Sequence, residues 1–169
     1  MSAHAQLRSA TRDAHDRVDA RFSALNLGDR DDYAAFLAAH ARAFVPLEEA
    51  LTAAGAAELL DDWDESLRTS SLLADLAELG VPPPPPSAAL EFVDEAEMIG
   101  ALYVLEGSRL GGAVLRTSVP TGLPSRFLSH RPPGGHWRRV IAMMERKLYS
   151  NAMREAAARG AMQAFALFE

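Results

Sequence analysis

Residues 103–115 read YVLEGSRLGGAVL, a helical stretch that three glycines interrupt within six residues. Good helix formers and apolar residues at helical spacing flank the glycines on both sides. Each interior glycine costs a helix roughly 1 kcal/mol relative to alanine, so the three together cost about 3 kcal/mol. Gly107 and Gly111 are four residues apart and share one face of the helix. The missing side chains weaken the helix so that it can bend, and they let either another helix or a ligand approach the backbone.

The composition indicates one helical domain. The chain has 169 residues, enough to bury a real core, and 49% of them are hydrophobic. Alanine and leucine dominate while β-branched residues are sparse, which favours helices over sheet. We therefore expect an all-α fold in a single domain that spans residues 1–169.

Charge and cysteine content exclude several classes of protein. The net charge is −6 and no block of basic residues stands out, so nucleic acid is not an expected partner. The absence of cysteine excludes disulfides, thiolate metal sites and thiol nucleophiles, and it agrees with a reducing cytoplasm. No signal peptide precedes the first helix and no apolar run approaches the ~20 residues of a membrane span. We expect a cytoplasmic protein that does not enter a membrane.

Apolar spacing and helix-ending residues divide the chain into helices. Proline runs and glycines mark the loops, with Pro82 to Pro86 as a rigid, extended connector. The predicted helices cover about residues 3–21, 29–55 with a kink at Pro46, a short turn around 59–63, 70–79, 88–117, a short turn at 125–128, 137–148 and 151–168.

His15 is the histidine best placed for chemistry. It falls on the less polar stripe of the first helix, with Leu7, Val18 and Phe22. An imidazole on such a stripe is either a core residue or a metal ligand whose second nitrogen is fixed by a neighbour. His40 also faces inward on its helix, and we expect it to be a core residue.

The other polar residues give no simple metal site. We expect His4, His130 and His136, near the terminus or in loops, to be exposed. Glutamates on facing helices with Glu-x-x-His pairs would bind two irons, but no such pair occurs. Glu91, Glu95 and Glu97 are better explained as a solvated helix face. The sequence also lacks a His-x-x-x-His zinc pair, a nucleophile elbow and a phosphate-binding loop.

One histidine and one glycine-rich helix suit a large, flat ligand. A haem needs an axial base on one side and room for dioxygen on the other. Histidine supplies the base, and a helix without side chains at Gly107, Gly111 and Gly112 can lie directly over the opposite face.

Three segments resemble one known family, the haem oxygenases. Residues 7–15, LRSATRDAH, with Val18 following, are similar to the proximal helix of that family. Residues 103–115 look like its distal helix, in the form of bacterial members that include those associated with bacteriophytochromes. The ending FALFE, residues 165–169, is similar to the last helix. The resemblance implies an all-α fold with haem between the first helix and a kinked distal helix. It further implies that haem is both cofactor and substrate, and that dioxygen opens it to biliverdin, iron and carbon monoxide.

The resemblance also implies roles for residues around the iron. His15 would be the axial ligand of the haem iron. Gly107, Ser108, Gly111 and Gly112 would line the distal face, where backbone atoms contact dioxygen. Some haem oxygenases have an aspartate that orders proton-delivering water, and here the matching residue is Ser108. The sequence therefore leaves the route of the protons open, and bacterial relatives with a serine there are compatible with turnover through other ordered waters.

The haem propionates are carboxylates and require cations. The resemblance implies Arg8 and Arg138 as the propionate partners, because they fall where the family has basic residues, ahead of Arg12 and Arg139. Glu106 is expected either to fix the proximal imidazole or to pair with an arginine, and the sequence leaves both open.

We expect two protein partners, an electron donor and an acceptor of the product. No flavin or nicotinamide motif is present, so we expect an external electron donor, a ferredoxin or a reductase. A bacteriophytochrome is a candidate acceptor of the biliverdin. Two alternatives remain open: a haem-binding carrier or sensor with little turnover, and a helical protein that binds another small molecule and uses His15 only in its core.

Overall fold

The computed structural model describes all residues from Met1 to Glu169 and contains helices but no strand, which confirms the predicted all-α class. One continuous hydrophobic core joins residues from the first helix to the last. The helices are α1 (Ala3–Ala10), α2 (Arg12–Ser23), α3 (Arg30–Ala53), α4 (Ala56–Leu59), α5 (Trp63–Ser66), α6 (Thr69–Glu78), α7 (Glu95–Leu115), the 3₁₀ turn η1 (Arg116–Ser118), α8 (Arg126–Ser129), α9 (His136–Lys147) and α10 (Asn151–Phe168).

The first predicted helix is two helices, α1 and α2, with Thr11 between them. The Thr11 hydroxyl donates to the carbonyl oxygen of Leu7 at 2.9 Å, alongside the Thr11 amide at 3.0 Å. Its backbone leaves the helical region, with φ −104° and ψ 4°. A threonine that bonds the preceding turn in this way weakens regular helix, which explains the break.

Helix caps set the other boundaries. The side chain of Asp29 accepts bonds from the amides of Asp31 and Asp32 and begins α3, which continues through Pro46 to Ala53. Gly55 and Gly80 follow α3 and α6 with φ of 93° and 73°, as expected for glycines that end helices. The short turns expected near residues 59–63 and 125–128 are α4 with α5 and α8.

Helix α7 begins later than predicted, at Glu95 instead of near residue 88. The carboxylate of Asp94 accepts the Glu97 amide, and the carboxylate of Glu97 accepts the Val93 amide, so the two side chains cap the helix reciprocally. Glu97 is only 4% exposed and also binds Arg159. Our expectation of a solvated Glu97 is wrong, because this cap draws it into the contact with α10.

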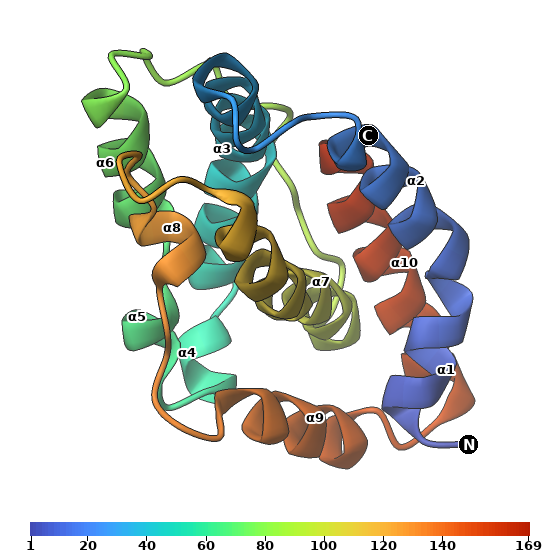
Figure 1. Ribbon diagram of the computed structural model, residues 1–169. Coiled ribbons are helices and arrows are strands. Elements are labelled where there is room, and N and C mark those ends of the chain that lie inside the picture. The colour runs from blue at the N-terminus through green and yellow to red at the C-terminus, as the bar shows by residue number, and fades with distance from the viewer.

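Two glycines bring α7 and α10 into backbone contact. A Cβ on Gly100 would lie 1.8 Å from the carbonyl oxygen of Ala157, and a Cβ on Gly160 would lie 1.9 Å from that of Glu97. Neither position tolerates a side chain, so these glycines fix the closest helix pair of the fold. Figure 1 shows α7 in the middle of the molecule, with α10 along the side that also carries α1 and α2.

One segment, Glu95–Ser118, is long and apolar enough to cross a membrane by length and composition, with a mean hydropathy of 1.2. We expected no segment of that kind. In the structure this segment is the central helix, and its first half contains ten buried residues, seven of which belong to the hydrophobic core. Core packing therefore accounts for the apolar composition of the first half, whereas Leu110 and Val114 in the second half are exposed.

Candidate functional site

A cavity of about 840 Å³ lies between α2 and the second half of α7. Its size is typical of sites for small molecules and cofactors. From α1 and α2 it is lined by His4, Arg8, Thr11, Arg12, His15, Asp16, Val18, Asp19 and Phe22, and from α7 by Tyr103, Val104, Gly107, Ser108, Leu110, Gly111, Gly112 and Leu115. The remaining lining residues are Phe36, His40, Arg68, Phe127, Leu128, Trp137, Phe165 and Phe168.

The glycines of α7 form an open wall of this cavity. A Cβ on Gly111 would meet no atom within 4 Å, and one on Gly107 would first meet Trp137 at 3.6 Å. A Cβ on Gly112 would lie 3.4 Å from Leu128, an ordinary contact. Helix packing therefore does not require these three glycines, in contrast to Gly100 and Gly160. This part of the helix backbone therefore has room beside it for a ligand.

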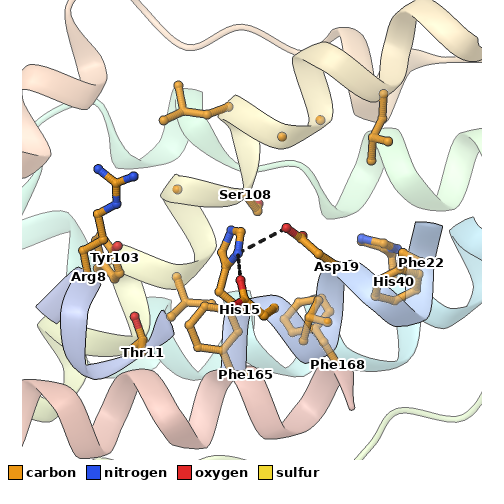
Figure 2. A pocket seen from close by; sticks show the side chains of 18 of the residues that line it. Arg8, Thr11, His15, Asp19, Phe22, His40, Tyr103, Ser108, Phe165 and Phe168 are labelled. Atoms are coloured by element: carbon orange, nitrogen blue, oxygen red, sulfur yellow. Dashed lines mark ion pairs between the residues drawn. The ribbon is translucent and has the colours of Figure 1, made fainter. Parts of the chain in front are cut away.

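His15 projects into the cavity from α2 (Figure 2). Its Nδ1 lies 3.2 Å from an Asp19 carboxylate oxygen and 3.9 Å from Asp16, and its side chain is 60% exposed. The ring packs edge-on against Phe165 at 6.2 Å between centroids. A carboxylate on Nδ1 fixes the tautomer and leaves Nε2 free to bind a metal. The exposure does not fit a core histidine.

Asp19, and not Glu106, is the carboxylate that contacts the imidazole of His15. The sequence holds the signal for it, because His15 and Asp19 are four residues apart and so share one helix face. Glu106 has the other expected role, as an arginine partner: it is buried and binds Arg109 at 2.5 Å.

His136 is only 3% exposed, so our expectation of an exposed loop residue is wrong. Its Nδ1 lies 2.7 Å from Asp62 and its Nε2 lies 2.6 Å from Glu106. Burial alone would lower the pKa of His136, but the bonds to the two carboxylates outweigh burial and raise it. Because both partners are acceptors, the ring must donate from both nitrogens, as an imidazolium does. The first residue of α9 is thereby clamped to α7 and to the turn before α5.

The other histidines border or flank the cavity. His40 is half-buried between the rings of Phe22 and Phe36, and burial lowers its pKa to about 4, so it is neutral near pH 7. This position agrees with the expected core role. His4 is half-buried against Tyr103 and Trp137, and His130 lies 3.2 Å from Arg109, so neither is the exposed residue that we expected.

Arg68 adds a cation that the sequence did not indicate. One guanidinium nitrogen, Nη2, donates to the Leu105 carbonyl and to the Ser108 hydroxyl, both at 2.8 Å. The guanidinium also lies over the rings of Phe44 and Phe127, at 4.6 and 5.2 Å from their centroids. Burial lowers the pKa of Arg68 to about 9, which still leaves it charged near pH 7. It lies 40 residues before Ser108, and no local pattern connects the two.

Of the arginines predicted to bind propionates, Arg8 lines the cavity and so does Arg12. Arg139 is engaged elsewhere, by Asp62 and by the carbonyls of Pro133 and Gly134. Arg138 is exposed on α9, next to Trp137 but outside the cavity lining. The structure thus brings Arg8 together with His15, Gly107, Ser108, Gly111 and Gly112, and it leaves Arg138 at the margin.

No model of a known protein family matches the sequence. A curated heme oxygenase of Xanthomonas campestris pv. campestris is 36% identical over 152 residues, which are 83% of this chain and 88% of that protein. The chain belongs to the haem oxygenase family. This membership confirms the predicted class of enzyme, one that degrades haem. The heme oxygenase PigA of Pseudomonas aeruginosa is 29% identical over 173 residues, 96% of this chain and 87% of that protein.

Solved structures show the same haem oxygenase fold. A heme oxygenase from Neisseria meningitidis superposes with a TM-score of 0.84 at 23% identity, covering 99% of this chain and 88% of that one. The heme oxygenase from Leptospira interrogans gives a TM-score of 0.74 at 19% identity, covering 99% of this chain and 97% of that one. The predicted fold is therefore confirmed over the whole chain.

Proposed function

We propose that this haem oxygenase binds haem in the cavity between α2 and α7 and opens it to biliverdin, with release of iron and carbon monoxide. The observation that carries the proposal is that His15 and the open glycine wall border one cavity from two different helices. When bound, haem supplies the oxidative chemistry with dioxygen and external electrons, while the protein supplies binding and orientation.

His15 is the residue that would ligate the iron, through Nε2. The Nδ1–H group would donate to Asp19 at 3.2 Å, which fixes the ring and makes its other nitrogen a better donor. Neither residue needs to move far, because α2 already presents both to the cavity (Figure 2).

The α7 wall would hold the other face of the haem. Gly107, Gly111 and Gly112 leave the backbone bare, so the haem and a small second ligand fit against it. The hydroxyl of Ser108 accepts a bond from Arg68 and donates its own proton to Leu105 at 2.6 Å. No carboxylate from α7 lines the cavity. These contacts support proton delivery through ordered water instead of a side-chain acid on this helix.

The propionates would bind to cations at the rim. Arg8 on α1 is the first choice because it borders the cavity beside Tyr103 (Figure 2). Arg138 remains a second proposed partner, one residue from Trp137, which lines the cavity. A guanidinium suits a carboxylate because it can donate two parallel hydrogen bonds.

We further infer that electrons come from an external ferredoxin or reductase, since the chain has no flavin or nicotinamide motif of its own. The absence of cysteine supports a cytoplasmic location. A bacteriophytochrome is the acceptor that the form of residues 103–115 suggests.

Two measurements test the proposal. Haem titration should give a saturable Soret band that is lost or shifted in His15→Ala and unchanged in His130→Ala, a histidine outside the cavity lining. Aerobic incubation of the complex with ascorbate or a ferredoxin system should then replace that band by biliverdin absorbance. A haem spectrum that persists without biliverdin would make the protein a carrier or sensor, and no Soret change at all would reject haem binding.

A further inference from the structure

The guanidinium of Arg68 is a buried charge without a direct ion pair. Arg68 is 3% exposed, yet none of the ion pairs in the molecule includes it. The nearby carboxylate of Glu48 is taken by the backbone amides of Arg68 and Thr69, at 2.8 and 3.0 Å. Glu106 binds Arg109 and His136 instead.

Such a charge is costly to bury, because the loss of hydration exceeds what neutral partners return. The contacts with Leu105, Ser108 and two aromatic rings compensate for part of the cost. The positive charge of Arg109 opposes that of Arg68, whereas the carboxylates of Glu106 and Glu48 offset it in part without direct contact. Moreover, the Nε atom of Arg68 is buried and has no hydrogen-bond partner. The guanidinium therefore keeps one buried N–H donor without a partner, and no carboxylate binds it directly.

Arg68 borders the cavity, and its contact with Ser108 places its charge at the glycine wall of α7. We propose that Arg68 is the anion-binding group of the cavity and favours a small monovalent anion over a neutral ligand on the Ser108 side of bound haem. The inference rests on the proposed function, since haem brings the iron that such an anion would bind.

A carboxylate of the haem itself is the other anion of suitable chemistry. We favour the small anion because Arg68 is buried behind Ser108, whereas Arg8 is exposed and open to a propionate at the cavity rim. Haem and its dimethyl ester separate the two sources, because the ester has no propionate charge.

The test uses the ferric haem complexes of the wild type, Arg68→Met and Arg68→Lys, titrated with fluoride and followed by absorbance. Loss of a charge-assisted contact should lower the fluoride affinity of Arg68→Met by roughly 10- to 100-fold, and Arg68→Lys should recover part of it. Carbon monoxide, a neutral ligand of the ferrous complex, should bind all three proteins alike. Arg30→Met is the matched control, because Arg30 also donates to a backbone carbonyl, that of Leu79, but lies outside the cavity lining.

The outcomes are separable. Equal fluoride affinity in the wild type and Arg68→Met, with a normal Soret band in both, overturns the proposal and leaves the proposed function intact. Weak binding of haem by Arg68→Met, with normal binding of the dimethyl ester and of fluoride, assigns Arg68 to a propionate and also overturns it. No Soret band in the wild type rejects the proposed function itself. If Arg68→Met loses helical circular dichroism, Arg68→Gln replaces it, because a glutamine side chain can still donate to the Leu105 carbonyl without a charge.

Discussion

At the scale of single residues, glycine has two unrelated uses in this chain. Gly100 and Gly160 allow α7 and α10 to touch, whereas Gly111 faces empty space. The sequence drew attention to the second kind because three glycines cluster there. The packing role of Gly100 and Gly160 could not be predicted from the sequence. The residue that excludes a side chain at Gly100 is Ala157, which lies on another helix.

This contrast predicts opposite effects of one substitution. Gly100→Ala should destabilise the fold by roughly 2–4 kcal/mol, because its Cβ would overlap the Ala157 carbonyl. Gly111→Ala should stabilise α7 by up to about 1 kcal/mol, because alanine favours helix and finds free space. Urea unfolding followed by circular dichroism measures both. Equal free energies of unfolding for the two variants would contradict the assignment of Gly111 to a ligand face.

Gly111→Leu tests whether the space beside Gly111 is needed for haem binding. Its side chain fits within α7 but fills the cavity, so helix content should stay near that of the wild type while haem affinity falls about tenfold or more. A Soret titration with circular dichroism of each sample measures both quantities. Normal haem binding by Gly111→Leu would mean that the haem does not lie against this wall.

Asp19 is predicted to act through His15. Asp19→Asn should weaken haem iron binding about tenfold or more, because a neutral amide supports the imidazole less than a carboxylate does. The iron–histidine stretching frequency of the ferrous complex should fall at the same time, as measured by resonance Raman spectroscopy. Asp16→Asn is the control, since Asp16 lies 3.9 Å from Nδ1 and should have little effect. An unchanged frequency in Asp19→Asn would remove the proposed support.

At the scale of elements, polar contacts hold both ends of α9, while Val140, Met143 and Met144 pack its middle into the core. His136 clamps its first turn between Asp62 and Glu106, and the Glu145 carboxylate in its last turn accepts the amides of Ala3 and His4 at 2.9 and 3.0 Å. Figure 1 shows α9 along the lower edge of the molecule, between α4 and α1. These polar contacts connect α9 to α7 and the turn before α5 at one end, and to α1 at the other.

The His136 clamp should make stability depend on pH. The raised pKa of His136 means that its contribution is complete below its unfolded pKa of about 6.5 and is lost as pH rises through the folded pKa. The lowered pKa values of Asp62 and Glu106 mean that their contribution is present above about pH 4 and is lost as pH falls through their folded pKa values. The clamp is therefore strongest in mild acid.

His136→Asn should lower the free energy of unfolding on the order of 2 kcal/mol near pH 6, and by less near pH 9. Urea titrations at both pH values measure the two differences. His130→Asn is the control with the opposite sign, because burial beside Arg109 lowers the pKa of His130 and its contribution is lost in acid. A loss for His136→Asn that grows with pH would show that the ring is not an imidazolium in the clamp.

At the scale of the whole molecule, the helices around the cavity differ in how tightly they pack. The α7–α10 pair is in backbone contact, whereas α2 has a single buried residue, Ala14, and borders the cavity. A ligand that fills the cavity binds the folded state alone and so stabilises it.

Haem should therefore raise the thermal unfolding midpoint. At one hundred times its dissociation constant it would add about 2.7 kcal/mol, which corresponds to roughly 5–10 °C for a chain of this size. Differential scanning calorimetry of wild type and His15→Ala, with and without haem, measures the shift, which should be much smaller in the variant. Hydrogen exchange should slow most in α2 and in the second half of α7, and protection confined to α4 and α5 would place the haem elsewhere.

The sequence by itself determined the helical class and most helix positions, because helix periodicity, caps and glycine cost are local properties. The pairing of His15 with the glycines of α7 was predicted from the needs of a haem and from the resemblance to haem oxygenases. Ser108 and Arg8, which the resemblance to haem oxygenases singled out, both line the cavity. The sequence misplaced the start of α7, where Asp94 and Glu97 cap each other, and it treated Glu97 and His136 as exposed.

Only the tertiary structure decided the partners that come from distant parts of the chain. Arg68 meets Ser108 across 40 residues, and His136 meets Asp62 across 74. No spacing in a sequence encodes such contacts, because they depend on how whole helices pack around the Gly100 and Gly160 contact. The proposed iron ligand, His15, could therefore be predicted from one helix, whereas the charge of Arg68 on the Ser108 side of the cavity required the fold.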